Sequence, residues 1–126
     1  MKARLITGSR VWPAKLYDWV WSACHQAEFL VLGDCATGAD LWARRFAEFY
    51  QRPHRVHVAN WNKYRGNAGP NRNTEMVRDL LGTSFALDIE IDAVAFITPW
   101  SPCRGTRDCW SKCRKQNIPV IEARAT

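Results

Sequence analysis

The sequence has no apolar run long enough to cross a bilayer, and no segment after Met1 has the core of a signal peptide. A strand-like stretch, Ala3–Thr7, begins almost at once. We therefore expect a cytoplasmic protein with no membrane partner. With 126 residues, of which 47% are hydrophobic and 24% charged, residues 1–126 are expected to form one globular domain, and disorder is excluded as the main state.

The chain also has no CxxC motif, and its cysteines form an odd set of five without a secretory signal. Free thiols in a reducing compartment are the simplest interpretation. Cys109 and Cys113 lie four residues apart and Cys103 precedes them, but no fourth ligand is evident. We therefore predict no metal site.

Three motifs of common enzymes are missing. The turn Gly8-Ser9-Arg10 does not match GxGxxG, and Gly33–Asp40 lacks the lysine and the GK[ST] ending of a P-loop. No GxSxG elbow occurs. These absences exclude the standard dinucleotide dehydrogenases, P-loop NTPases and α/β hydrolases.

What the chain does contain is a regular alternation of strand and helix patterns. Most of the strand-like runs are apolar throughout, which is typical of a parallel sheet covered on both faces. The sequence thus predicts an α/β three-layer sandwich with a mainly parallel five-stranded sheet. The predicted strands are Ala3–Thr7, Phe29–Leu32, Arg55–Ala59, Ala93–Ile97 and Pro119–Ala123.

The elements between these strands are predicted less uniformly. An amphipathic helix with Pro13 in its first turn is expected to extend to about Glu28. The stretch Asn60–Asn73 is expected to be a long polar loop. The following helix is expected to end at Gly82, and Phe85–Ile91, whose apolar residues alternate, is expected to be an extended connection or a short edge strand.

Several turns that follow strands carry residues suited to a ligand. Because ligands of parallel sheets bind beyond the carboxyl ends of the strands, these turns predict a nucleotide-sized crevice. In Arg104-Gly105-Thr106 the hydroxyl is either an ordinary helix cap or part of an anion site with the free amides of that helix. Asp40 either forms a capping box with Thr37 or holds ligand hydroxyls or a cation.

The net charge of the chain limits the possible classes of ligand only in part. The chain has 18 Lys and Arg against 12 Asp and Glu, giving a net charge of +6. This favours phosphorylated small molecules or nucleic acid, and the scattered positions of the cations do not choose between them.

The motifs resemble the Rossmann-like SLOG superfamily, and within it the YspA/YAcAr-type domains (DUF2493), over nearly the whole chain. The matching pieces are Ile6–Arg10, Gly33 with Thr37–Asp40, Trp61, Ala68–Asn73 with Met76, and Arg104–Thr106. The resemblance implies binding of nucleotides or nucleotide-derived signals, in proteins often found in phages and bacteria. It also implies a homodimer, because related family members associate.

The same superfamily contains LOG-type phosphoribohydrolases, which cleave the base from nucleoside monophosphates with a PGGxGTxxE motif. Here the run Pro99–Cys109 lacks the glycine pair, and Cys109 stands where the resemblance places the catalytic Glu. A thiol on an apolar helix face cannot stabilise an oxocarbenium-like centre as a carboxylate does. The superfamily also includes the DNA-binding DprA.

Three functional hypotheses follow. The first is a domain that binds or senses a phosphorylated nucleoside without another cofactor; the second is a hydrolase of such ligands using Asp40, Asp108 and Arg72; the third is single-stranded nucleic-acid binding by stacking tryptophans. The predicted ligand-binding residues are Gly8, Ser9, Arg10, Gly33, Gly38, Ala39, Asp40, Trp61, Tyr64, Arg72, Asn73, Pro99, Arg104, Gly105 and Thr106.

Overall fold

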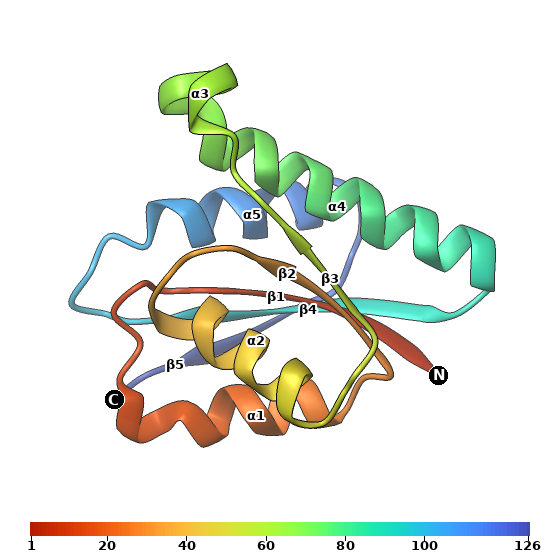
Figure 1. The fold of residues 1–126 in the computed structure, drawn as a ribbon, viewed down its shortest axis with the longest axis horizontal. Helices are drawn as coiled ribbons and strands as arrows, with labels where there is room; N and C mark the ends of the chain where they lie inside the picture. The colour runs from red at the N-terminus through yellow and green to blue at the C-terminus, as the bar shows by residue number, and fades with distance from the viewer.

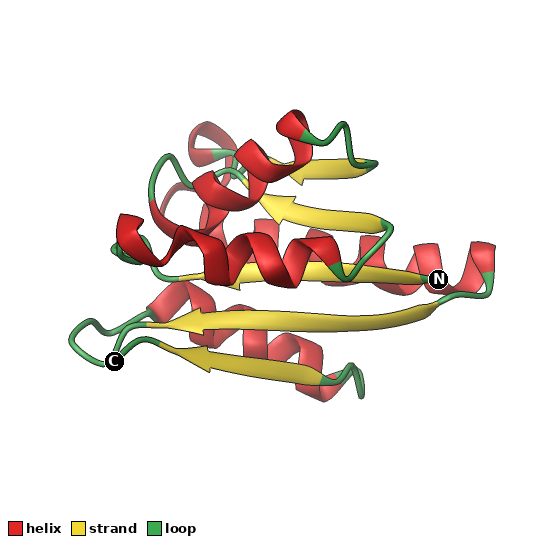
Figure 2. Ribbon diagram, turned by 90° about the horizontal axis from the view of Figure 1, so that it is seen from below, coloured by secondary structure: helices red, strands yellow, loops and turns green.

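Five parallel strands form the centre of the protein. The computed structural model describes residues 1–126. The strands follow the order β3-β2-β1-β4-β5, and Figure 2 shows all of their arrows pointing the same way. Their bounds are β1 Lys2–Gly8, β2 Phe29–Gly33, β3 His54–His57, β4 Glu90–Ile97 and β5 Val120–Arg124. The predicted α/β fold, a Rossmann-like three-layer sandwich, is confirmed, and the sheet is parallel throughout.

Helices cover both faces of the sheet (Figure 1). One face carries α1, Tyr17–His25, and α2, Gly38–Phe49; the other carries α4, Ala68–Leu87, and α5, Arg104–Lys115. Three short turns complete the chain: 3₁₀ turns at Ala14–Leu16 and Arg65–Asn67, and α3 at Trp61–Tyr64. No helix is long and apolar enough to cross a membrane.

The hydrophobic core has two parts because successive strand side chains point to opposite faces. On β1, Ile6 packs toward α1 and α2, where Val20 and Phe46 are fully buried. Its neighbour Leu5 packs toward α4 and α5, where it joins Leu80. A sheet that is apolar on both faces in this way requires both helical layers.

A buried ion pair joins β1 to β4 within the sheet. Arg4 donates from Nε and Nη2 to the two carboxylate oxygens of Asp92, at 2.7 and 2.8 Å, and from Nη1 to the carbonyl of Ala23. Burial opposes ionisation of Asp92, but the hydrogen bonds from Arg4 and Lys2 outweigh it and hold the pKa of Asp92 below its usual value. The pair thereby fixes α1 to the sheet.

The prediction of a long polar loop over Asn60–Asn73 is wrong. Asn60 caps α3 by accepting the N–H of Lys63 at 3.0 Å, and α4 already begins at Ala68. Pro70 is tolerated there because the first amides of a helix have no intrahelical acceptor. The polar composition of the stretch therefore belongs to helix starts that face solvent.

The prediction for the end of α4 is also wrong. The helix does not stop at Gly82 but continues to Leu87 and ends at Asp88, whose φ is 52°. Consequently Phe85–Ile91 is not an extended connection or edge strand: its first residues are the last turn of α4, and β4 begins at Glu90. Phe85 is 93% exposed, so its place in an alternating apolar pattern reflects no packing.

Boundaries elsewhere shift by a few residues. Pro13 precedes a 3₁₀ turn rather than opening α1, which begins at Tyr17 and ends at His25, three residues before the predicted end. The third strand ends at His57 instead of Ala59. These differences do not change the topology.

Candidate functional site

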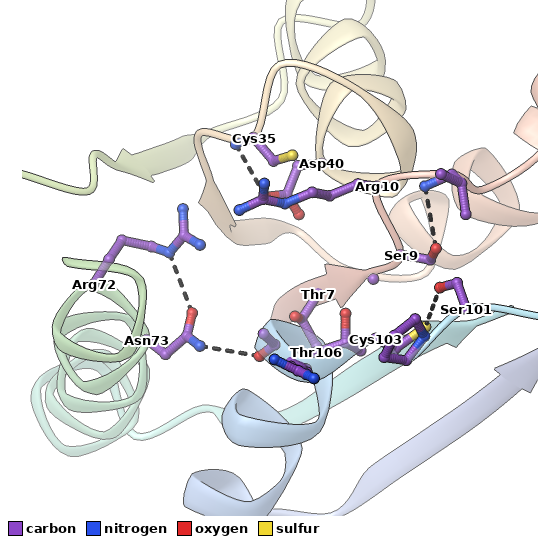
Figure 3. Close-up of a pocket in the computed structure, with 15 residues that line it drawn as sticks. Thr7, Ser9, Arg10, Cys35, Asp40, Arg72, Asn73, Ser101, Cys103 and Thr106 are labelled. Atoms are coloured by element: carbon purple, nitrogen blue, oxygen red, sulfur yellow. Dashed lines mark hydrogen bonds between the residues drawn. The ribbon is translucent and has the colours of Figure 1, made fainter. Parts of the chain in front are cut away.

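The loops that follow β1, β2 and β4 meet at the carboxyl edge of the sheet, beside the switch point between β1 and β4. A cavity of about 380 Å³ lies among them, with the start of α4 on one side (Figure 3). Most of the predicted ligand-binding residues line it: Gly8, Ser9, Arg10, Asp40, Arg72, Asn73, Arg104, Gly105 and Thr106. The crevice is thus where the topology of a parallel sheet places it.

The start of α5 forms one wall of this cavity. The helix begins at Arg104, and its first internal hydrogen bond runs from the N–H of Arg107 to the carbonyl of Cys103, at 2.9 Å. The amides before Arg107 have no acceptor within the helix and give this end a partial positive charge. A Cβ added at Gly105, which lines the cavity, would have no atom from a neighbouring element within 4 Å.

Thr106 is not the cap of this helix, as one of the two interpretations held. Cys103 holds the N-cap position, with φ of 50° and no side-chain cap hydrogen bond. Thr106 lies inside the first turn, is only 4% exposed and lines the cavity, and its hydroxyl has no hydrogen-bond partner in the protein. The start of α5 therefore offers an anion amides without an intrahelical acceptor and the hydroxyl of a side chain that is itself largely buried.

The turn after β1 offers a ligand fewer free backbone amides than its sequence suggests. The N–H of Ser9 donates to the carbonyl of Phe96 at 2.8 Å, and its hydroxyl accepts from Thr98 at 2.7 Å. The first bond occupies the amide that a phosphate would use, whereas the hydroxyl accepts in its bonds and still has its own proton to donate. What the turn does present to the cavity is Arg10, which is exposed and has no carboxylate partner.

Gly33, Gly38 and Ala39 do not line the cavity. An added Cβ on Gly38, whose φ is 73°, would lie 2.1 Å from the carbonyl oxygen of Ser9. The same atom on Gly33 would lie 2.6 Å from a carboxylate oxygen of Asp40. Gly38 thus lets the start of α2 approach the turn after β1, and Gly33 leaves room for the Asp40 carboxylate beside β2.

Asp40 is the buried carboxylate of the cavity. It does not form a capping box, because the Thr37 hydroxyl donates to the carbonyl of Arg10 and Asp40 accepts the N–H of Cys35 at 3.2 Å. Burial raises the pKa of Asp40 to about 6, against the opposing charge of Arg72. A carboxyl that gains and loses its proton near neutral pH can act as an acid or a base.

Arg72 and Asn73 reach the cavity from α4. Arg72 donates to Asp34 at 2.5 Å and to Asn73 at 3.2 Å, which leaves part of its guanidinium toward the cavity. Asp108 lies outside the cavity and holds Asn73 in place by accepting from its amide at 3.0 Å. Of the three residues named for a hydrolase, the structure brings Asp40 and Arg72 together at the cavity and keeps Asp108, the other acid–base candidate, outside it.

Trp61, Tyr64 and Pro99, which the sequence predicted to bind the ligand, do not line this cavity. Trp61, which is 53% exposed, lines an adjoining cavity of about 320 Å³ that shares Arg10 and Arg72 with the first. Tyr64 and Pro99 line neither cavity. The residues that the two cavities share are Arg10, Cys35 and Arg72.

The chain is 35% identical over 131 residues to the Gene 61 protein of Mycobacterium phage D29. The alignment covers 96% of this chain and 95% of the phage protein. The chain belongs to the family of this phage protein. No protein-family model matches the chain, and no solved structure matches it.

In this member of the Gene 61 protein family, sequence reasoning missed part of the cavity wall. Ser101 and Cys103 line the cavity from the loop after β4, and their side chains lie 3.3 Å apart (Figure 3). Thr7 and Cys35 line it as well. The usable signal was the cluster of small polar side chains between Pro99 and Arg104, in a turn that follows a buried strand.

No group of three or more His, Cys, Asp or Glu side chains in this Gene 61 family member is placed to hold a metal ion. Cys109 and Cys113 are fully buried on the side of α5 that packs against the sheet. Cys103 precedes the first residue of α5 and lines the cavity instead. The cationic groups of the cavity, Arg10, Arg72 and Arg104, outnumber its single lining carboxylate, Asp40. The site favours an anionic ligand.

Proposed function

We propose that this chain binds a phosphorylated nucleoside, such as a nucleotide or a nucleotide-derived signal, in the cavity at the carboxyl edge of the sheet. The observation that carries the proposal is the start of α5: Arg104, Gly105 and Thr106 line the cavity, the amides before Arg107 have no acceptor within the helix, and the Thr106 hydroxyl has no partner in the protein. Such an arrangement suits a phosphate group. The resemblance to the SLOG superfamily supports the same ligand class.

The dimensions of the site suggest how the ligand lies. A cavity of about 380 Å³ falls within the ordinary range of small-molecule sites. With the phosphate at the start of α5, the nucleoside extends past Arg72 toward the adjoining cavity, where the ring of Trp61 is available for stacking on the base. This orientation uses both cavities with one ligand.

Calorimetry with adenine nucleotides, NAD, ADP-ribose and cyclic dinucleotides tests the proposal. We expect at least one ligand to bind more tightly than about millimolar. Arg104→Gln should weaken that binding about tenfold, because a charge-assisted hydrogen bond to phosphate is lost. Lys115→Gln, which removes the same charge from the other end of α5, serves as the control and should bind like the wild type.

Hydrolysis of the same ligand is the second candidate, favoured by one observation. Asp40 lines the cavity, and burial raises its pKa to about 6, which suits a general acid or base. Incubation with nucleoside monophosphates, followed by chromatography for free base, tests this candidate. Free base that forms with the wild type and not with Asp40→Asn supports hydrolysis. If no substrate gives free base, hydrolysis is refuted and ligand binding is the remaining function.

A further inference from the structure

Cys103 occupies a special position in the cavity wall. It holds the N-cap position of α5 in a left-handed backbone conformation, with φ of 50°. Its Sγ lies 3.3 Å from the hydroxyl of Ser101 and 3.5 Å from that of Thr98 (Figure 3). The side chain is 9% exposed, and the cavity is where it meets solvent.

The surroundings of Cys103 favour its thiolate. Burial opposes ionisation, but hydrogen bonding to the sulfur, above all with the Ser101 hydroxyl, outweighs it and holds the pKa of Cys103 below its ordinary value. The amides at the start of α5 add a partial positive charge beside the sulfur. Thiolates are the reactive form of cysteine.

The other cysteines differ from Cys103 in access or in ionisation. Burial raises the pKa of Cys24 to about 12, and the hydrogen bond with Cys113 together with burial raises that of Cys109. The pKa of Cys113 is lowered by its bond with Cys109, but its side chain is fully buried in the core. Cys35 lines the same cavity from the opposite wall and is the natural internal reference.

A second feature indicates that the cavity receives an anion next to this sulfur. The Thr106 hydroxyl, on a side chain only 4% exposed, faces the cavity without a partner one helical turn from Cys103. The β4 and β5 residues packed against Cys103 are apolar: Ala95, Ile97 and Val120. The charged and titratable side chains that share the cavity with it are Arg10, Cys35, Asp40, Arg72 and Arg104.

We propose that Cys103 is a nucleophilic modification site that reacts with an electrophilic carbon carried on a carboxylate or phosphate. The start of α5 and Arg104 hold the anionic group. The thiolate sulfur attacks the carbon; a carbon–sulfur bond forms, the bond to the leaving group breaks, and the leaving group departs with its electron pair. The thiol proton has already been lost to water. The reaction goes beyond the proposed nucleotide binding and does not depend on it.

Paired alkylating agents test this assignment. Iodoacetate and iodoacetamide transfer similar groups to sulfur with loss of iodide, but only iodoacetate is an anion. Peptide mass spectrometry after alkylation at pH 7 gives the rate at Cys103 and at Cys35 in the same molecule. Relative to the ratio measured with glutathione, we expect the iodoacetate to iodoacetamide ratio at Cys103 to be higher by about tenfold.

Variants separate the anion site from the sulfur. Arg104→Gln should slow the alkylation of Cys103 by iodoacetate and leave its rate of alkylation by iodoacetamide unchanged. Ser101→Ala, which removes a positioning hydroxyl, should move the pH midpoint of alkylation by iodoacetamide upward. Cys103→Ser should lose the labelled peptide, while Cys35→Ser keeps it. Circular dichroism of each variant confirms that the fold is retained.

Two results would overturn the assignment. One is a folded wild-type protein in which Cys35 is alkylated at pH 7 and Cys103 is not. The other is an iodoacetate to iodoacetamide ratio at Cys103 that equals the ratio for glutathione. Neither result bears on calorimetric binding of nucleotides, and absent nucleotide binding does not alter the labelling, so the two proposals fail separately.

Discussion

Replacement of Asp40 by Asn should make the protein more stable at neutral pH. Asp40 is 7% exposed, and burial raises its pKa from 3.8 to about 6. Between about pH 4 and 6 the native state therefore binds more protons than the unfolded chain, and stability falls as the pH rises through this window. At pH 7 the charged carboxylate destabilises the fold by about 3 kcal/mol relative to its neutral form.

Asn is the neutral form in nearly the same shape, because its amide oxygen can still accept the N–H of Cys35. Urea unfolding of the wild type and of Asp40→Asn at pH 4, 5, 6, 7 and 8 measures the effect. We expect similar stability at pH 4 and an advantage of up to about 3 kcal/mol for the variant at pH 7. Other titrating groups affect both proteins equally and cancel in the difference.

Asp88→Asn is the matched control. Asp88 is exposed at the end of α4 and has φ of 52°, a conformation that Asn adopts readily. This variant should show no pH-dependent difference from the wild type. If Asp40→Asn instead became less stable than the wild type as the pH rose from 4 to 8, the carboxylate would be favourably paired when charged, and the argument from burial would be refuted.

Three further changes test the fold. Gly38→Ala should destabilise by about 2 kcal/mol or more in thermal unfolding, because φ is 73° and the new Cβ would lie 2.1 Å from the Ser9 carbonyl oxygen; unchanged stability would contradict that close approach. Arg4→Met should cost about 3 to 5 kcal/mol in urea, since it removes both hydrogen bonds that Arg4 donates to the buried Asp92 and leaves only Lys2 beside it, and a loss under 1 kcal/mol would contradict it. Phe85→Ser should change stability by less than about 0.5 kcal/mol, as expected for an exposed helix residue and not for a packed edge strand.

The sequence specified the sheet well because apolar strands of a parallel sheet are hard to mistake. Runs such as Phe29–Leu32 and Ala93–Ile97 lie inside the strands that the structure contains. Once the strands were assigned, the carboxyl-edge position of the intervening turns followed from topology alone. This is why residues as distant as Arg10, Arg72 and Arg104 could be predicted to meet.

Segments whose conformation depends on a few local contacts were predicted poorly. A polar stretch with two glycines and a proline suggests a loop, yet the capping bond of Asn60 and the tolerated position of Pro70 make Asn60–Asn73 largely helical. The sequence also does not show which polar groups are free to contact a ligand. In the structure, for example, the Ser9 amide already donates to the Phe96 carbonyl.

The unfavourable burial of Asp40 becomes understandable when the charges of the empty and filled cavity are compared. Without a ligand, the charged carboxylate helps to balance Arg72, whose attraction is one of the forces that oppose the raised pKa. An anion that binds beside Arg72 would repel the Asp40 carboxylate. The Asp40 side chain must then move away or take up a proton. At pH 7, protonation of a carboxyl with a pKa of about 6 costs only about 1.4 kcal/mol, against about 4 kcal/mol for an ordinary aspartate. Burial thus allows the cavity to exchange its own negative charge for that of a ligand at small expense.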